Sequence, residues 1–167
     1  MKVRRATPED VPALVALFGE LDQMQRDWRV FTPRPDFRDE VREKYQQAVS
    51  AADAVVLVAE EDSEVVGMVY GEVHVPSRFS DERALELSGV VARSGYRGRG
   101  IGRKLVEEAA RFAKDLGVDW IELRTFAPNQ DAMRFWQGLG FTPRVVQLTC
   151  STEALVGRLE RESRPFP

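Results

Sequence analysis

Cysteine is almost absent from this sequence of 167 residues. The single cysteine, Cys150, has no second cysteine with which it could form an internal disulfide. The sequence also lacks the cysteine and histidine spacings that are typical of metal sites. We therefore expect no bound metal and a reducing, cytoplasmic environment.

Long apolar runs and an excess of positive charge are lacking as well. No run approaches the roughly 20 apolar residues of a membrane-spanning helix, and the N-terminal MKVRRATPED lacks the apolar core of a signal peptide. The formal net charge is -3 and the isoelectric point is near 5.4, whereas nucleic-acid-binding domains are usually basic. These absences predict a soluble intracellular protein with neither nucleic acid nor membrane among its partners.

The composition that remains is that of an ordinary globular protein. Hydrophobic residues make up 43% and charged residues 31% of the chain, so the length suffices for one domain with a substantial core. We find no repeats, no low-complexity tract and no linker. We therefore predict a single domain over residues 1–167, with residues 151–167 as a C-terminal helix and tail.

Hydrophobic periodicity predicts a mixed α/β domain in the order β-α-α-β-β-β-α-β-α-β-α. A helix start is indicated by TPED, with Thr7 as N-cap and Pro8 in the first turn. Residues 61–64 are predicted to form the turn of an antiparallel hairpin. The predicted strands are 3–6, 54–61, 64–75, 84–92, 118–126 and 141–150. The predicted helices are 11–21, 37–48, 101–116, 129–140 and 151–162, the last capped by Ser151.

The most distinctive stretch is GYRGRGIG, residues 95–102, with four glycines and two arginines. It follows a predicted strand and leads into a predicted helix, whose first amides lack internal partners and attract anions. Glycines let a phosphate approach those amides closely, and Arg97, Arg99, Arg103 and Lys104 add positive charge. The alternative is a glycine-rich turn with solvated arginines, but the spacing favours phosphate binding.

Two common phosphate-binding patterns do not fit this stretch. A Walker A loop needs Lys and then Ser or Thr after its last glycine, but Gly100 is followed by Ile101 and Gly102. The dinucleotide pattern needs a third glycine where the chain has Arg103. A nucleotide-binding function is therefore not indicated.

The spacing Arg-x-x-Gly-x-Gly, at Arg97, Gly100 and Gly102, resembles the acyl-CoA pyrophosphate loop of the GNAT superfamily of N-acetyltransferases. Downstream, NQDAMRFWQGLGF resembles the second signature of that family. The matching positions are Asn129, Ala132, Phe135, Trp136, Leu139, Gly140 and Phe141.

The resemblance implies a fold and a co-substrate. The expected fold is a mixed, mostly antiparallel sheet with one splayed pair of parallel strands, flanked by helices. The expected co-substrate is acetyl-CoA, whose pantetheine arm would pair with the backbone of Val90, Val91 and Ala92. The other cofactor-binding residues that the resemblance implies are Arg97, Gly98, Arg99, Gly100, Ile101, Gly102, Arg103, Asn129, Phe135 and Trp136. For Asn129, capping the following helix is an equal alternative.

Glu86 is the candidate catalytic base, because some family members carry a catalytic glutamate in the strand before the loop. Strand alternation predicts that Glu86 shares one face with Ser88, Val90 and Ala92. The alternatives for Glu86 are an exposed strand carboxylate or a charge that binds the acceptor. Glu72 and His74, the only histidine, are weaker candidates, and a structural role is the favoured alternative for His74.

Trp136 departs from the family pattern. Many members have a tyrosine there, which protonates the CoA sulfur, and an indole cannot supply that proton. A thiolate is a good leaving group and needs proton donation less than an alcohol or amine does. Water, or a tyrosine from elsewhere such as Tyr70, can serve instead, while Trp136 is expected to pack beside the pantetheine or in the core. A backbone N–H near Val91 or Ala92 is the expected oxyanion donor.

These features predict an acetyl-CoA-dependent N-acetyltransferase that acts on a primary amine of a small molecule or peptide. We expect Met24, Trp28, Phe31 and the loop of residues 74–83 to recognise the acceptor, with a place in the core or in a dimer contact as an equal alternative for the aromatic residues. The sequence leaves the oligomeric state open, and the resemblance adds a homodimer as one alternative, because family members often dimerise. The alternative is a non-catalytic acyl-CoA-binding sensor or interaction module on the same fold.

Overall fold

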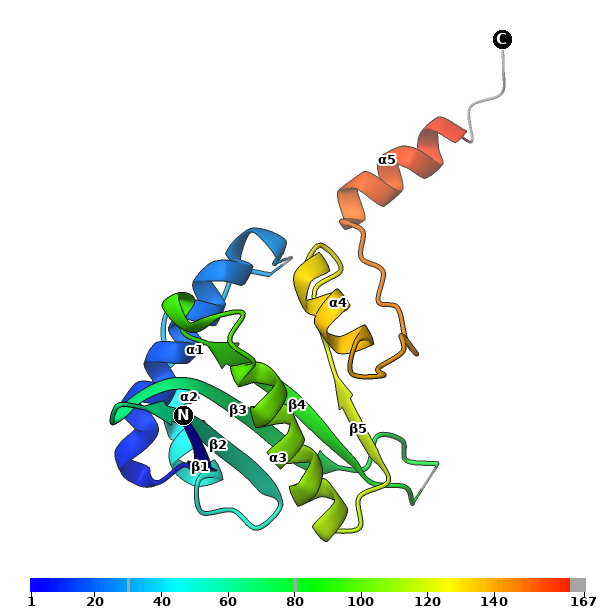
Figure 1. Cartoon of the computed structure of the whole chain (residues 1–167). Coiled ribbons are helices and arrows are strands. Elements are labelled where there is room, and N and C mark those ends of the chain that lie inside the picture. Colours follow the sequence, from blue (N-terminus) through cyan, green and yellow to red (C-terminus); the bar gives the residue numbers. More distant parts are fainter. Residues whose placement is uncertain (30, 80, 163–167) are drawn as a thin grey trace. The chain divides into compact units, whose positions relative to one another are not determined.

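The computed structural model describes residues 1–29, 31–79 and 81–162 (Figure 1). The chain divides into two compact units, Met1–Pro128 and Asn129–Pro167, and each is described by itself. The predicted single domain over residues 1–167 stays a prediction.

The first unit contains a five-stranded sheet whose strands follow one another in chain order. The first four strands pair antiparallel, and the fourth and fifth pair parallel. The predicted fold class, a mostly antiparallel mixed sheet flanked by helices, is therefore confirmed. The strands are β1 (Lys2–Arg5), β2 (Ala54–Glu61), β3 (Glu64–His74), β4 (Ala84–Ala92) and β5 (Trp120–Leu123).

The predicted hairpin forms between β2 and β3. Its turn residues Asp62 and Ser63 have positive φ angles of 50° and 63°, as two-residue hairpin turns of the mirror-image type require. The register set by this turn holds only as far as Glu60, because a shift between Ala59 and Glu60 changes the pairing before the strands enter the core.

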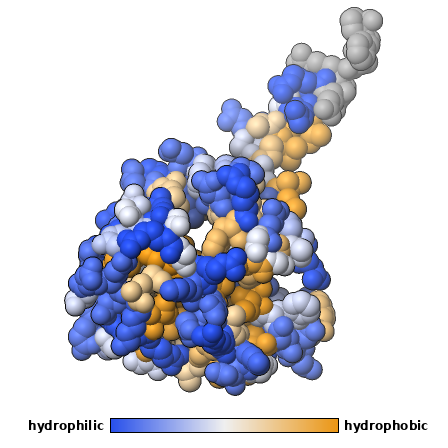
Figure 2. Space-filling view, viewed as in Figure 1, coloured by the Kyte–Doolittle hydropathy of each residue, from blue (hydrophilic) through white to orange (hydrophobic). Residues whose placement is uncertain are grey.

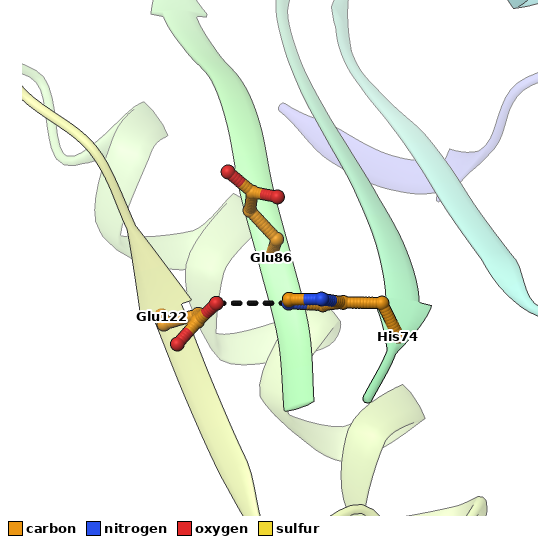
Figure 3. Close-up of side chains that lie close together, drawn as sticks. All are labelled: His74, Glu86 and Glu122. Atoms are coloured by element: carbon orange, nitrogen blue, oxygen red, sulfur yellow. Dashed lines mark hydrogen bonds and ion pairs between the residues drawn. The ribbon is translucent and has the colours of Figure 1, made fainter. Parts of the chain in front are cut away.

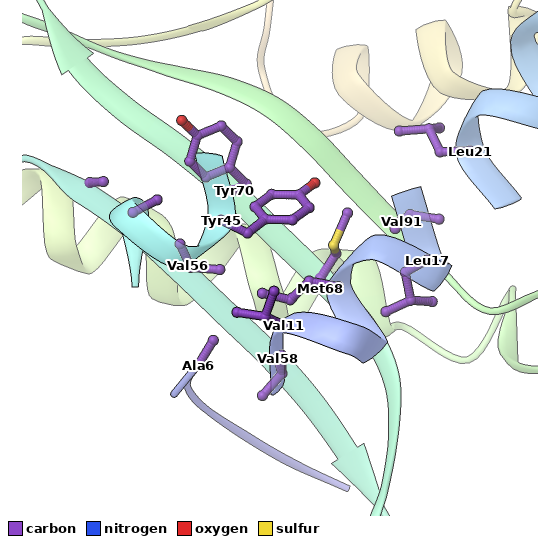
Figure 4. Packing of buried hydrophobic residues seen from close by; sticks show 13 residues of the cluster. Ala6, Val11, Leu17, Leu21, Tyr45, Val56, Val58, Met68, Tyr70 and Val91 are labelled. Carbon is purple, nitrogen blue, oxygen red and sulfur yellow. The ribbon is translucent and has the colours of Figure 1, made fainter. Parts of the chain in front are cut away.

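Helices α1 (Val11–Gln25) and α2 (Phe37–Ala48) pack on one face of the sheet (Figure 4). Leu17 and Met68 are fully buried there, and Tyr45 packs edge-on against Tyr70 with ring centroids 5.5 Å apart. Burial of each large apolar side chain contributes about 2 kcal/mol. This cluster holds α1 and α2 against β2, β3 and β4.

Helix α3 (Ile101–Asp115) covers the other face. Its buried Ile101 and Leu105 lie against β3 so closely that a Cβ atom on Gly67 would stand 2.7 Å from Ile101 Cγ2. Glycine at this position therefore lets the first turn of α3 approach the sheet.

The start of α1 is tied to β1 through Arg4. The Arg4 guanidinium donates to both carboxylate oxygens of Asp10, at 2.6 and 2.9 Å, and to Glu60 on β2 at 2.9 Å. Asp10 also accepts from the Thr7 amide at 2.8 Å. The hydrogen bonds from Arg4 hold the pKa of Asp10 below its usual range. This partly buried pair connects the edge of the sheet to the short 3-10 turn Pro8–Asp10, which precedes α1.

A β-bulge interrupts β4. Tyr70 pairs with Gly89 and the next residue, Gly71, pairs with Leu87, so Ser88 is an extra residue without a partner on β3. The extra residue changes which face each later side chain of β4 occupies.

The predicted common face of four β4 side chains is therefore wrong. Glu86 pairs with Glu72, which forms an ion pair with Lys44 of α2, so Glu86 lies on the face that carries α1 and α2. Beyond the bulge, Ala92 pairs with Gly67, which faces α3. The bulge separates Glu86 from Val90 and Ala92, and a simple two-residue alternation cannot anticipate it.

The parallel pair is short. β4 and β5 pair only over Ala84–Leu87 and Trp120–Leu123, so β5 is shorter than the predicted strand 118–126. Within the described strands, the ladder stops at Leu87, whereas β4 continues to Ala92. The last part of β4 thus has a sheet neighbour on its β3 side only.

The second unit contains α4 (Gln130–Gln137) and α5 (Thr152–Glu162). The Ser151 hydroxyl accepts from the Ala154 amide at 3.2 Å, which confirms the predicted cap. The predicted strand 141–150 is wrong, because these residues form no strand although all of them are described. A β-rich sequence becomes a strand only beside a pairing partner, and Pro143 lacks an amide hydrogen for a ladder. Apolar side chains of this segment and of α5 are exposed (Figure 2).

Candidate functional site

The loop between β4 and α3 leads into a helix whose first amides have no bond within the helix. Gly98 and Gly100 adopt left-handed conformations with φ angles of 74° and 79°, and Gly100 caps α3. The Lys104 amide bonds to the Gly100 carbonyl at 3.2 Å, so the amides of the first three helical residues, 101–103, lie before the first intrahelical bond. A side chain at Gly98 or Gly100 would have no other part of the described chain within 4 Å of its Cβ atom, apart from the residues next to it in the sequence. The loop therefore has open space next to a helix N-terminus.

Arginines surround this loop, but they are not equally available. Arg97 Nε donates to the Ala92 carbonyl at 3.2 Å, which holds the side chain beside the end of β4. Arg99 pairs with Glu61 at 2.6 Å and stacks over Tyr96 at 5.2 Å. Arg103 is exposed on the first turn of α3. An anion at the loop would meet Arg97 and Arg103 first.

The β4 residues predicted to bind pantetheine, Val90, Val91 and Ala92, lie just before this loop. Val91 is buried in the α1/α2 core, whereas Val90 and Ala92 are half-buried. All three pair with β3 and lie beyond the end of the β5 ladder. Their second edge therefore has no strand partner, and apart from the Ala92 carbonyl, which accepts from Arg97, its backbone groups are available to a ligand that carries amide groups.

A row of three carboxylates crosses the sheet before the bulge. Glu86 stands directly opposite Glu72 on β3 and Glu122 on β5. Like charges at directly opposed positions are unfavourable. Positively charged side chains offset this for two of them, since Lys44 lies 3.2 Å from Glu72 and Arg124 lies 3.3 Å from Glu86.

The third carboxylate is bonded to the only histidine of the chain. His74 Nε2 lies 2.8 Å from Glu122 Oε1, and Figure 3 shows that this bond crosses β4 just beside Glu86. His74 pairs with Ala84, which is fully buried and small, so the imidazole can reach over β4 to β5. One nitrogen or oxygen atom of each of His74, Glu86 and Glu122 lies within 4.8 Å of the others.

This cluster can act in two chemical ways. Histidine and glutamate are ligands that divalent cations accept, and the same groups bind ammonium groups and transfer protons. A metal would have to compete with Arg124 for the Glu86 carboxylate, and with the existing bond for His74 Nε2 or Glu122 Oε1. The existing bonds favour proton transfer and the binding of an organic cation.

The cofactor-binding residues predicted in the second unit form a local cluster. The Asn129 side chain accepts from the Ala132 amide at 3.1 Å and so caps α4. Trp136 is 9% exposed and packs edge-on against Phe135 and Phe141, with ring centroids 4.8 and 5.2 Å away. The helix-capping alternative for Asn129 is therefore realised, and Trp136 lies in an aromatic core.

The residues predicted to recognise the acceptor are dispersed. Trp28 packs on Phe126 with ring centroids 6.3 Å apart, beside the segment that follows β5. Phe31 is exposed and lines an open cavity of about 420 Å³ together with Arg26 and Arg29, and Met24 is exposed on α1. The loop of residues 74–83 is exposed over residues 75–79, and Ser80 lies outside the described residues.

Comparison with known proteins gives the family. Residues 21–141 match the Acetyltransferase (GNAT) family. The chain belongs to the GNAT family of acetyltransferases. An uncharacterized N-acetyltransferase of Archaeoglobus fulgidus is 29% identical over 136 residues, which cover 81% of this chain and 89% of that protein. N-acetyltransferase 8F1 of Rattus norvegicus is 33% identical over 111 residues, 66% of this chain, and this match spans 50% of the rat protein.

A solved structure shows the same fold. The BH1408 protein of Bacillus halodurans, in a tetramutant form, superposes with a TM-score of 0.77 at 23% identity, over 90% of this chain and 99% of that one. None of the helices in the described part of the GNAT chain is long and apolar enough to cross a membrane.

Tyr70 is poorly placed to replace the tyrosine that many GNAT proteins use as a proton donor. Its hydroxyl is buried and has no hydrogen-bond partner among the described residues. Burial, with the nearby Glu72 carboxylate, raises the pKa of Tyr70 above its usual value. Water is therefore favoured over Tyr70 as the proton donor to the CoA sulfur.

Sequence reasoning missed Glu122 and Arg124, and it treated His74 as a weak candidate. The strand that carries Glu122 was predicted, but its register with β4 was not. This parallel register places Glu122 opposite Glu86. Register depends on how strands assemble, so no local sequence signal reveals the carboxylate row.

Proposed function

We propose that this GNAT protein transfers the acetyl group of acetyl-CoA to a primary amine of a small molecule or peptide, in the cytoplasm. The main support is the open glycine loop at the start of α3, next to the part of β4 that lacks a β5 partner. Amides and arginines suited to a diphosphate thus adjoin backbone groups suited to a chain of amides. The single exposed cysteine supports a reducing location.

The residues of the first unit fit such a co-substrate. The amides of Ile101, Gly102 and Arg103, with the Arg97 side chain, would hold the diphosphate. The open backbone edge at residues 90–92 would pair with the pantetheine amides. Bound acetyl-CoA supplies the activated thioester. A backbone N–H near Val91 or Ala92 would donate to the oxyanion that forms on the thioester carbonyl.

Glu86 is the proposed catalytic carboxylate. An amine with a pKa of about 10.4 is protonated near pH 7, and its deprotonation there costs roughly 4 to 5 kcal/mol. Glu86 would bind the ammonium group and accept its proton, directly or through water. The neighbouring Glu72 and Glu122 carboxylates make this part of the sheet attractive to a cation.

The CoA thiolate is a leaving group that does not need a strong proton donor from the protein. A thiol has a pKa of about 8.5, so its thiolate departs without a strong acid. This explains how transfer can proceed although Trp136 cannot donate a proton and the Tyr70 hydroxyl is buried.

A non-catalytic acyl-CoA sensor is the second candidate. The observation that favours a sensor is Trp136, which occupies the position of the usual proton donor and packs against Phe135 and Phe141. Such a protein would keep the loop and β4 edge but would not release the thiol.

The test is thiol release from acetyl-CoA in the presence of polyamines, amino acids, aminoglycosides and lysine peptides, each offered separately. We expect release that depends on the amine, together with the N-acetylated amine in equal amount. Binding of acetyl-CoA without turnover on any amine would favour the sensor. Failure to bind CoA would overturn both candidates.

A further inference from the structure

His74 on β3 forms a cluster with Glu86 on β4 and Glu122 on β5. The function proposed so far gives His74 no role. Its Nε2 atom is 2.8 Å from Glu122 Oε1. An ionised carboxylate only accepts hydrogen bonds, so Nε2 carries the hydrogen and Nδ1 has a free lone pair. The Glu122 side chain thereby fixes both the orientation and the tautomer of the ring, as a carboxylate does for a catalytic histidine.

The surroundings of His74 are mostly anionic. Among the described residues, the carboxylates of Glu86 on β4 and Glu122 on β5 form a cluster with His74, and Glu72 lies two residues earlier on β3. Their cationic partners are Arg124 after β5 and Lys44 on α2. The imidazole and the Glu122 carboxylate are both partly exposed, so protons and small molecules can reach the group from solvent.

We propose that His74, oriented by Glu122, takes over the proton that Glu86 removes from the acceptor amine; this inference rests on the proposed acetyl transfer. The ammonium loses one proton through Glu86 to His74 Nδ1, which makes the imidazole cationic and leaves the nitrogen lone pair free. That lone pair forms the N–C bond, and the C–S bond breaks with its electron pair on sulfur. The second amine proton is lost to water, and the thiolate leaves as such or takes a proton from water.

An imidazole suits this role better than a carboxylate alone. An ordinary glutamate has a pKa of about 4.3 and an ordinary histidine about 6.5, so a proton on Glu86 returns easily to the amine. A base is most effective when its pKa lies near the working pH. The bond between His74 and Glu122 stabilises the imidazolium while the amine attacks.

The test is the pH dependence of kcat/KM for the amine in the full-length protein. The variants are His74→Gln and Glu122→Gln, and the control is Glu107→Gln, which changes a carboxylate of α3 that pairs with Arg111. For His74→Gln we expect a loss of about 100-fold near pH 7 and an acidic limb of the profile that moves to lower pH. Added imidazole should restore part of the rate of His74→Ala. The KM for acetyl-CoA and the melting temperature should stay near the wild-type values.

The outcomes separate this inference from the proposed function. Wild-type turnover with an unchanged pH profile in His74→Gln would overturn the role of His74 and leave the acetyl transfer standing. Absence of turnover in the wild-type protein, on every amine, would overturn both. A Glu122→Gln profile like that of wild type would overturn the positioning role of Glu122.

Discussion

His74 of β3 and Glu122 of β5 are bonded to each other across β4, although their strands are not neighbours in the sheet. The residue that pairs with His74 on β4 is Ala84, whose small side chain leaves space for the imidazole to reach over β4. Glu86 is next on the same face of β4, so three strands of a packed sheet fix the relative positions of three titratable groups. A site built on strands keeps its geometry better than one built on loops.

Glu86→Gln should lower kcat/KM for the amine mainly at low pH. At high pH more of the amine is already neutral, so less depends on a base, whereas near pH 6.5 we expect a loss of about 100-fold. Steady-state rates between pH 6 and pH 10 measure the effect, with Glu107→Gln as the matched surface control. A small loss that is the same at every pH would reassign Glu86 to acceptor binding or to the surface.

Trp136→Phe should lower stability but hardly change the rate. The indole packs between Phe135 and Phe141, and its truncation to phenylalanine should cost about 1 to 2 kcal/mol. An indole donates no proton to the thiolate, and the loss of a group without an acid–base role changes the rate little. We therefore expect kcat to stay within about threefold of wild type. Thermal unfolding and turnover are measured on the same preparation. A fall in kcat of two orders of magnitude at unchanged stability would contradict the packing role.

Asp10→Asn should destabilise the protein by about 2 kcal/mol at pH 7, as expected for hydrogen bonds to a charged group. The pKa of Asp10 is lowered in the folded protein, chiefly by Arg4, and in the unfolded chain it is about 3.9. The stabilisation is therefore full above pH 4 and is lost as the pH falls through the folded-state pKa.

Urea unfolding of Asp10→Asn and wild type at pH 7 and pH 2.5 tests this prediction. Glu43→Gln, which changes an exposed carboxylate of α2, is the control and should show little difference at either pH. A difference between Asp10→Asn and wild type that is equally large at pH 2.5 would show that the carboxylate charge is not the cause.

Much of the fold was readable from local signals. The bounds of β4 and α2 agree with the predictions, because strong periodicity and clear turn residues limit both elements. The bulge at Ser88 could not be predicted from local sequence, because it depends on how β4 pairs with β3. It also changes which face of the sheet the following side chains occupy. Residues 141–150 show the same limit, because their β-rich pattern finds no partner strand among the described residues.

The candidate site also has one part that local sequence predicts and one part that it does not. The loop at residues 95–102 could be found from sequence because its glycines are local requirements of backbone conformation. The contact of His74 with Glu122 spans 48 positions of the chain. It depends on the order and register of three strands, which a single sequence does not specify.

The most direct test of the central claim is calorimetric titration of CoA into wild-type protein, Gly100→Val and Gly95→Val. Gly100 has a φ of 79° and borders the open space at the start of α3, where valine would be strained by about 1 to 2 kcal/mol and would fill the place of the diphosphate. Gly95, in the same loop, has no positive φ and has open space around it. We predict that wild type and Gly95→Val bind CoA and that Gly100→Val, still folded by circular dichroism, does not. Unchanged affinity in Gly100→Val would contradict the assignment of this loop as the CoA-binding site.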